Sequence, residues 1–262
     1  MTLASIKPNG LPKMPSFRLE GKTALVTGAS RGVGLAAAAA LAEAGAHVTL
    51  AARSEEDLTI ACESINSNGG YATSLVLDVT DSRRVSQAVA ERGPFNILVN
   101  SAGMNRPVEL VAMDDRDLDE ILLLNVKAAF YLCRAVARGL LDANERGSLI
   151  NISSQMGHVG SPGRTVYCAS KHAIEGMTKA LAWELGESGI RVNTICPTFI
   201  ETAMTAQMFE RPGFRAWVAS KNALGRVGQI EEVMGSVVFL ASEASSLMTG
   251  SALLLDGGWT SA

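Results

Sequence analysis

The sequence predicts an α/β fold built on a doubly wound parallel sheet of about seven strands, with helices on both faces. Two observations carry this prediction. Short apolar runs alternate along the chain with alanine-rich segments of helical pattern, the order expected of repeated strand–helix units. The runs are also almost continuously apolar, as parallel strands covered on both faces require.

The elements can be assigned in chain order. The predicted strands are residues 23–28, 47–52, 72–79, 96–100, 148–154, 191–197 and 251–257. Helical patterns stand between them at 34–45, 117–140 and 166–187. No composition break divides residues 17–262, so these are expected to form one domain. Residues 1–16 contain Pro8, Pro12 and Pro15 and are expected to form a flexible N-terminal arm.

Composition and charge restrict the classes of partner. The chain has 262 residues, of which 47% are hydrophobic and 19% charged, with a net charge of -3 and a pI near 5.7. This balance argues against a disordered chain and against a nucleic-acid or anionic-membrane surface. No long apolar run and no secretory signal are found. We therefore expect a cytoplasmic protein that binds a small molecule.

The metal-ligating residue types show no binding pattern. The four cysteines lie far apart and form no C-x-x-C pair: Cys62, Cys133, Cys168 and Cys196. The three histidines are also scattered and show no metal-ligand spacing: His47, His158 and His172. Reduced structural thiols and no metal site are the expectation.

A glycine-rich loop joins the first predicted strand to the first predicted helix. It reads TGASRGVG, with glycines at Gly28, Gly32 and Gly34. Glycines permit a tight turn and a close approach of the backbone to a pyrophosphate, while the helix that follows presents unpaired N–H groups. The same pattern also fits a bare turn. The other loop residues included in the predicted nucleotide site are Ser30, Arg31 and Val33.

The second predicted strand bears on the choice of coenzyme. Dinucleotide folds that use NAD carry an acidic residue where this strand ends, and here that position is Ala52, followed by Arg53. Arg53 and Arg31 can bind a 2′-phosphate in bidentate fashion. This favours NADP(H), with NAD(H) possible. The alternative, that both arginines are solvated surface charges, stays open.

Tyr167 and Lys171 lie four residues apart in a predicted helix and therefore share a face. A free tyrosine has a pKa near ~10, and a nearby ammonium lowers that pKa by favouring the phenolate. A phenol tuned in this way can exchange a proton with an alcohol or a carbonyl. Taken alone, the pair also fits an ordinary amphipathic helix.

From about Gly21 to Gly258 the chain resembles the short-chain dehydrogenase/reductase family, which has a Rossmann-type sheet. The motifs that carry the resemblance are TGASRGVG at 27–34, NSAG at 100–103, Asn125, Ser154, YCASK at 167–171 and LLLDGGW at 253–259. The resemblance implies an NAD(P)-dependent oxidoreductase with a catalytic tetrad of Asn125, Ser154, Tyr167 and Lys171. It also implies a homotetramer.

The resemblance assigns a role to each member of the tetrad. Ser154 donates a hydrogen bond to the substrate oxygen, and Tyr167 acts as general acid or base. Lys171 lowers the pKa of Tyr167 and bonds the nicotinamide ribose, while Asn125 holds a water for proton relay. The further coenzyme contacts that it implies are Asp78, Val79, Asn100, Ala102, Gly103, Pro197, Ile200 and Thr202. One departure is Thr198, where the family has glycine.

The substrate is less constrained. Gln155, His158 and Arg164 follow Ser154 and are candidate substrate contacts, and a helical lid is expected after Thr202. The candidates for binding a substrate carboxylate are Arg106, Arg164, Arg211 and Arg215. A small polar substrate, a polyol or a sugar-derived acid, is favoured. The alternatives are a 3-oxoacyl-thioester reductase and a non-catalytic dinucleotide sensor; a sugar-nucleotide epimerase is disfavoured because the glycine loop has the wrong spacing.

Overall fold

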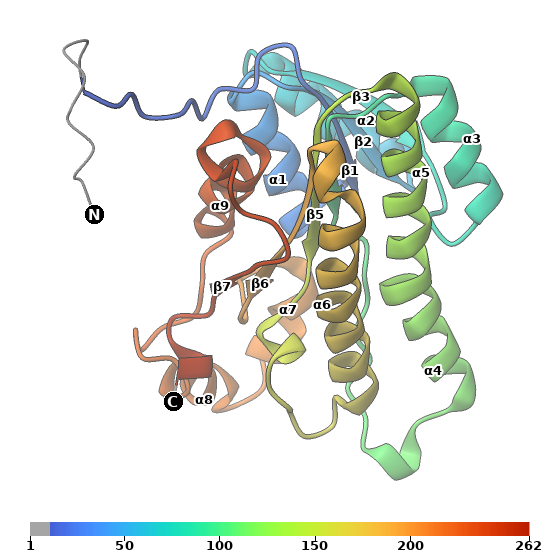
Figure 1. The fold of residues 1–262 in the computed structure, drawn as a ribbon. Coiled ribbons are helices and arrows are strands. Elements are labelled where there is room, and N and C mark those ends of the chain that lie inside the picture. Colours follow the sequence, from blue (N-terminus) through green and yellow to red (C-terminus); the bar gives the residue numbers. More distant parts are fainter. Residues whose placement is uncertain (1–10, 262) are drawn as a thin grey trace.

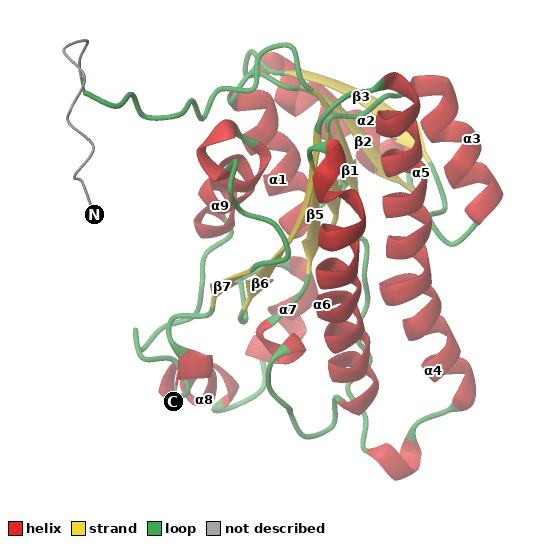
Figure 2. Ribbon diagram, in the orientation of Figure 1, coloured by secondary structure: helices red, strands yellow, loops and turns green. Residues whose placement is uncertain are grey.

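The computed structural model describes residues 11–261 and is centred on one sheet of seven parallel strands (Figures 1 and 2). The spatial order is β3-β2-β1-β4-β5-β6-β7. The strands are β1 Thr23–Thr27, β2 His47–Ala52, β3 Tyr71–Val76, β4 Ile97–Asn100, β5 Gly147–Ile152, β6 Ile190–Pro197 and β7 Ala252–Leu255. The predicted fold class is confirmed.

The predicted strands and the observed ones differ at their carboxyl ends. The predicted strand 72–79 ends at Val76, and the predicted strand 148–154 ends at Ile152. Beyond Val76 the neighbouring strand β2 has also ended and offers no further partner. Beyond Ile152 the chain leaves the ladder although β6 continues to Pro197. Apolar composition does not mark this point, which is why the sequence places the ends too late.

Helices cover both faces of the sheet (Figure 1). The helices are α1 Gly32–Glu43, α2 Glu55–Ser67, α3 Ser82–Arg92, α4 Asp115–Leu122, α5 Ala128–Ala143, α6 Thr165–Leu185, α7 Ala203–Phe209, α8 Phe214–Ser220 and α9 Glu231–Ala241. Buried side chains of α1, α2 and α9 share one core cluster, and those of α3, α5 and α6 share another. The sheet separates the two clusters because successive side chains of a strand point to opposite faces.

The predicted helix 117–140 is not continuous. It consists of α4, a π-helical turn at Leu123–Lys127, and α5. At the centre of the turn, the side chain of Asn125 accepts a hydrogen bond from Met104 N at 2.8 Å and donates one to Met104 O at 2.9 Å. A π turn holds one residue more than an α turn. Here that extra residue places the Asn125 amide against the loop that follows β4.

The N-terminal end of the described chain has no regular structure. Residues 11–16 are exposed and have no regular structure, while the rest of the expected arm, residues 1–10, lies outside the described residues.

Among the helices of residues 11–261, none combines the length and the apolar character needed to cross a membrane.

The two cores give a direct test of the fold. Leu98 of β4 is 0% exposed and belongs to the core of α3, α5 and α6. Leu98→Ala should lower the free energy of unfolding by about 2–5 kcal/mol, since it removes buried methyl groups and leaves a cavity. Urea unfolding measures this loss. Leu247→Ala is the matched control because Leu247 is 100% exposed, and an equal loss in both variants would contradict the described packing.

Candidate active site

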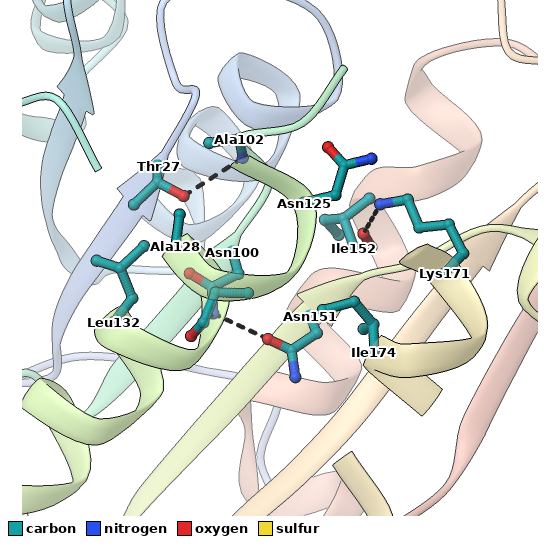
Figure 3. Close-up of a pocket in the computed structure, with 11 residues that line it drawn as sticks. Thr27, Asn100, Ala102, Asn125, Ala128, Leu132, Asn151, Ile152, Lys171 and Ile174 are labelled. Atoms are coloured by element: carbon teal, nitrogen blue, oxygen red, sulfur yellow. Dashed lines mark hydrogen bonds between the residues drawn. The ribbon is translucent and has the colours of Figure 1, made fainter. Parts of the chain in front are cut away.

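The sequence motifs converge at the carboxyl ends of the central strands. The glycine loop follows β1, the NSAG motif follows β4, and Ser154 follows β5. Since all strands are parallel, these ends lie along one edge of the sheet. Figure 3 shows how side chains from this edge and from the turn at Asn125 surround a small cavity.

The glycine loop can be built only from glycine at three points. A Cβ added to Gly28 would lie 3.0 Å from the Ala102 backbone, and one added to Gly34 would lie 2.2 Å from the Gly28 carbonyl oxygen. Gly28 and Gly32 also have φ of 63° and 58°, a region that favours glycine. The backbone therefore forms an open cradle at the start of α1, whose first N–H groups have no side-chain cap. This is the shape that a bound diphosphate requires.

Arg31 and Arg53 are both exposed, one in the glycine loop and one directly after β2. Because β1 and β2 are paired in parallel register, both residues lie at the same edge of the sheet. Neither arginine forms an ion pair within residues 11–261. Asp78 accepts hydrogen bonds from the backbone N and hydroxyl of Thr80 at 2.9 and 2.7 Å. These bonds lower the pKa of Asp78 and keep the carboxylate charged.

Buried polar side chains hold the strand ends in register. Thr27 Oγ1 accepts hydrogen bonds from Ser101 N and Ala102 N at 3.3 and 3.4 Å. Asn100 donates to Asn151 at 2.8 Å, and Asn151 donates to Thr178 of α6 at 2.9 Å (Figure 3). The Asn100 side chain is thus directed into the sheet. Asn100 is expected at the coenzyme, whereas Thr27, Asn151 and Thr178 are not among the expected site residues, because nothing in their local sequence marks a buried network.

Asn125 fixes the loop after β4 to α6. Besides its two bonds to Met104, its amide donates to Ser170 Oγ at 3.1 Å. The cavity beside it is bounded by the Lys171 side chain and Ile152 (Figure 3), and it has room for about one water molecule. A Cβ on Gly103 would lie 3.3 Å from Asn125 Oδ1 and 3.9 Å from Lys171 Nζ, so Gly103 keeps this cavity open.

The Ser154 side chain lies within hydrogen-bonding reach of the Tyr167 hydroxyl and acts to lower its pKa. Ser154 is buried, and its Oγ also accepts a bond from Met156 N at 3.1 Å. Burial raises the pKa of Tyr167, while the bond with Ser154 and the charge of Arg164 act to lower it. Arg164 lies at the N-terminal end of α6 and is one cation that acts on the phenol; that Lys171 also lowers the pKa of Tyr167 stays a prediction.

Lys171 is buried, and Nζ donates to Ile152 O at 2.9 Å. The same nitrogen is 5.6 Å from the centroid of the Tyr167 ring. Burial lowers the pKa of Lys171 to about 8, opposed by Cys196 and Glu175. Because a pKa of about 8 lies above neutral pH, Lys171 is mainly protonated there.

Arg164 is the buried member of the four candidate arginines. Its Nη2 lies 3.2 Å from Met208 Sδ, and its guanidinium lies 5.4 Å from the centre of the Phe199 ring. Burial lowers its pKa. No carboxylate pairs with it within residues 11–261. A buried guanidinium without an acidic partner is costly, and an anion bound beside Tyr167 would relieve that cost.

The other three candidate arginines are not buried cations without an acidic partner. Arg106 forms ion pairs with Asp117 and Glu120, and Arg215 pairs with Glu201. Their guanidinium groups are therefore already matched by carboxylates of the chain. Arg211 is exposed and close enough to Arg164 to lower its pKa.

The segment after β6 closes the site. The side chain of Thr202 lies 3.9 Å from the position of a Cβ on Gly32, which brings this segment onto the glycine loop. Ile200 forms a backbone bridge with Gly228, and Pro197 ends β6. Thr198 accommodates its branched side chain without a positive φ, but its Oγ1 is buried and has no partner within residues 11–261. The expected lid consists of α7 and α8.

Gln155 and His158, the two other candidate substrate contacts, differ in their surroundings. Gln155 is buried, with Oε1 unpaired among the described residues. The His158 ring is directed to Cys196 and Glu175, at 3.5 and 3.7 Å. The sequence shows no metal-ligand spacing, but the structure brings these three ligating side chains together. The expectation of no metal site stays a prediction.

Comparison with known proteins gives consistent matches. A family model described as enoyl-(acyl carrier protein) reductase matches residues 28–260. Gluconate 5-dehydrogenase of Gluconobacter oxydans is 39% identical over 248 residues, 93% of this chain and 96% of that protein. The 3-oxoacyl-[acyl-carrier-protein] reductase of Thermotoga maritima is also 39% identical, over 246 residues, 92% of this chain and 99% of that protein.

The fold comparison agrees with the sequence comparison. A gluconate 5-dehydrogenase from Burkholderia cenocepacia, solved in complex with NADP and tartrate, has a TM-score of 0.91 at 35% identity. The match covers 94% of this chain and 98% of that one. Together with the glycine loop and the Ser154, Tyr167 and Lys171 arrangement, these matches establish that the chain belongs to the short-chain dehydrogenase/reductase family.

Proposed function

We propose that this protein is an NADP(H)-dependent oxidoreductase that interconverts a secondary alcohol and a ketone on a polyol or a sugar-derived acid. The observation that carries the proposal is the pairing of Tyr167 with Ser154 beside Arg164, a buried cation without an acidic partner. Gluconate 5-dehydrogenase and D-threitol dehydrogenase are among the relatives, which supports the substrate class. Solved relatives that bind NADP support the coenzyme.

The chain's own residues account for the proton chemistry. In reduction, Tyr167 gives a proton to the substrate oxygen and Ser154 donates a hydrogen bond to the same oxygen; in oxidation, the tyrosine takes the proton. Arg164 opposes the effect of burial on the pKa of Tyr167. The water-sized cavity between Asn125 and Lys171 gives the lysine a route for proton exchange.

The coenzyme fits the residues present. Bound NADP(H) supplies or accepts the hydride. Gly28, Gly32 and Gly34 form the cradle for its diphosphate, and Arg31 and Arg53 are the cations available for a 2′-phosphate. The charged carboxylate of Asp78 is available for the adenine. The backbone around Asn100, Ala102 and Gly103, the side chain of Lys171, and residues Pro197, Ile200 and Thr202 complete the proposed contacts.

Reduction of a 3-oxoacyl thioester is the second candidate. The 39% identity to a 3-oxoacyl reductase supports it. Only the sugar-acid function requires Arg164 to bind a substrate carboxylate, because a thioester carries no carboxylate at the reacting end. A substrate panel of an aldonic acid, a polyol and a 3-oxoacyl thioester, followed by absorbance of NADPH, separates them. Activity on the thioester alone would exclude the sugar-acid proposal, and tight coenzyme binding without any turnover would favour the sensor.

We further propose a cytoplasmic homotetramer. Large apolar side chains are exposed on the outer helices, with Phe130 of α5 at 43% and Trp183 of α6 at 89%, and such side chains favour a subunit interface. The four cysteines are free and buried, which fits a reducing compartment. Light scattering of the purified protein tests the assembly.

Tyr167→Phe should lower kcat by roughly 10²- to 10⁴-fold, because it removes the general acid and base. NADPH binding, followed by fluorescence, should stay unchanged because the glycine loop is intact. A variant with near-normal kcat would overturn the proposed role of Tyr167.

Arg164→Gln should raise KM for the sugar acid and lower kcat/KM by roughly 10- to 100-fold, as expected for loss of a charge-assisted hydrogen bond. Turnover of a neutral polyol should fall less. Because Arg164 acts to lower the pKa of Tyr167 and the tyrosine must be deprotonated to act as the base, the acidic limb of the pH profile of alcohol oxidation should also move to higher pH. Arg106→Gln is the matched control, since Arg106 is already paired with acidic residues. Equal effects of the two substitutions would contradict the assignment.

Arg53→Ala and Arg31→Ala should each weaken NADPH binding by roughly 10- to 100-fold, because each removes a charged contact to the 2′-phosphate. NADH binding should change little. Arg138→Ala, an exposed arginine of α5, serves as the control. Parallel losses for NADPH and NADH would show that these arginines do not select the coenzyme.

A further inference from the structure

Three metal-ligating side chains from separate segments meet beside the proposed catalytic residues. His158 follows the short turn after Ser154, Glu175 lies on α6 one turn beyond Lys171, and Cys196 lies on β6. Cys196 Sγ is 3.5 Å from His158 Nε2 and 3.3 Å from Glu175 Oε1, and the last two atoms are 3.7 Å apart. All three ligand atoms lie within 4.8 Å of one another.

The three separations match those around a tetrahedral zinc ion. With bond lengths of about 2.3 Å to sulfur and about 2.0–2.2 Å to nitrogen and oxygen, tetrahedral angles place sulfur about 3.5 Å from nitrogen or oxygen. They place nitrogen about 3.4 Å from oxygen. The observed values of 3.5, 3.3 and 3.7 Å therefore require only small side-chain adjustments to receive the ion.

The charge of the cluster also favours a cation. Glu175 is 5% exposed, and no lysine or arginine forms an ion pair with it within residues 11–261. Its oxygens receive hydrogen bonds from the Thr194 hydroxyl at 3.0 Å and from the Cys196 thiol at 3.3 Å. A buried carboxylate that accepts hydrogen bonds from neutral hydroxyl and thiol donors, with an imidazole nitrogen 3.7 Å away, is a strong ligand for a divalent ion.

Hydroxyl groups lie next to the three ligating side chains. The Thr194 hydroxyl orients the Glu175 carboxylate, as partners of metal ligands commonly do. Ser153 is 4% exposed, and its hydroxyl is a further neutral group beside the Cys196 thiol. It lies 3.0 Å from the position of a Cβ on Gly157, which is itself 3.1 Å from Glu175 Cγ. A neutral hydroxyl thus lies close to both Cys196 and Glu175.

We propose that His158, Glu175 and Cys196 form a binding site for a divalent ion of the zinc type. The site has one nitrogen, one oxygen and one sulfur ligand, and its fourth position is open to water or to a substrate oxygen, as in three-ligand zinc sites. Coordination displaces the thiol proton of Cys196 to solvent. The His158 side chain is 27% exposed and gives the ion a way in. None of the three ligands belongs to the proposed catalytic tetrad.

The first measurement is titration of the chelator-treated, full-length protein with Zn²⁺ in competition with a chromogenic chelator. About one zinc ion per chain should bind. His158→Ala, Glu175→Gln and Cys196→Ser should each weaken zinc binding by at least about tenfold. His172→Ala and Cys62→Ser are the matched controls. His172 is exposed on α6, the helix that carries Glu175, and Cys62 is a buried thiol elsewhere in the chain. Both variants should bind zinc normally.

The second measurement uses Co²⁺ as a spectroscopic probe of the ligands. A tetrahedral site with one thiolate should give strong visible bands and a sulfur-to-cobalt band in the near ultraviolet, which Cys196→Ser should abolish. His158→Cys keeps a ligand at a partly exposed position that tolerates substitution. It should therefore retain zinc binding and strengthen the sulfur-to-cobalt band, whereas His158→Ala should lose tight binding.

These measurements distinguish a specific metal site from nonspecific metal binding at the surface. Zinc binding far below one ion per chain overturns the proposal, and so does equal binding by all variants. Weak six-coordinate cobalt spectra without a sulfur band overturn it as well. Circular dichroism and NADPH binding show whether each variant is folded. These readouts do not depend on turnover, so they stand apart from the proposed dehydrogenase function.

Discussion

Parallel pairing of the seven strands is the constraint on which the rest of the structure depends. It places every strand end at one edge, so the glycine loop, the NSAG segment and Ser154 become neighbours although they lie far apart in sequence. Parallel strands also require helical crossovers, and these crossovers deliver α6 with Tyr167 and Lys171 to the same edge. The site is thus a direct consequence of the sheet topology.

Buried polar side chains then set the position of each group at that edge. Thr27 holds the backbone of Ala102, Asn100 connects to Asn151, and Asn125 fixes the loop at Met104. In a low-dielectric interior such networks are favourable only when they are nearly complete. Their role is to position the backbone, which explains why the side chain of Asn100, a residue expected at the coenzyme, is directed into the protein.

Uneven distribution of charge distinguishes this site from a plain nucleotide-binding edge. Arg164 and Lys171 are buried cations without acidic ion-pair partners among the described residues, and Glu175 is a buried carboxylate one turn further along α6. Each is costly unless a ligand or a neighbour compensates it. The cations face the Tyr167 side of the site and the carboxylate faces Cys196 and His158. Both regions lie along one face of α6, since Lys171 and Glu175 are four residues apart and Glu175 acts to raise the pKa of Lys171.

The sequence by itself determined the fold class, the positions of the strands, the glycine loop and the shared face of Tyr167 and Lys171. These features depend on short-range periodicity and on backbone conformation, which neighbouring residues specify. It could not determine strand ends, the π turn at Asn125 or the choice among the candidate arginines, because these depend on which partners the fold supplies.

Only the tertiary structure decided that Arg106 and Arg215 are paired while Arg164 is not. It also brought together His158, Glu175 and Cys196, which are spread over three elements. No spacing rule applies to ligands that come from a loop, a helix and a strand. Their separation is fixed by helix–sheet packing across the chain, and that information is not local in the sequence.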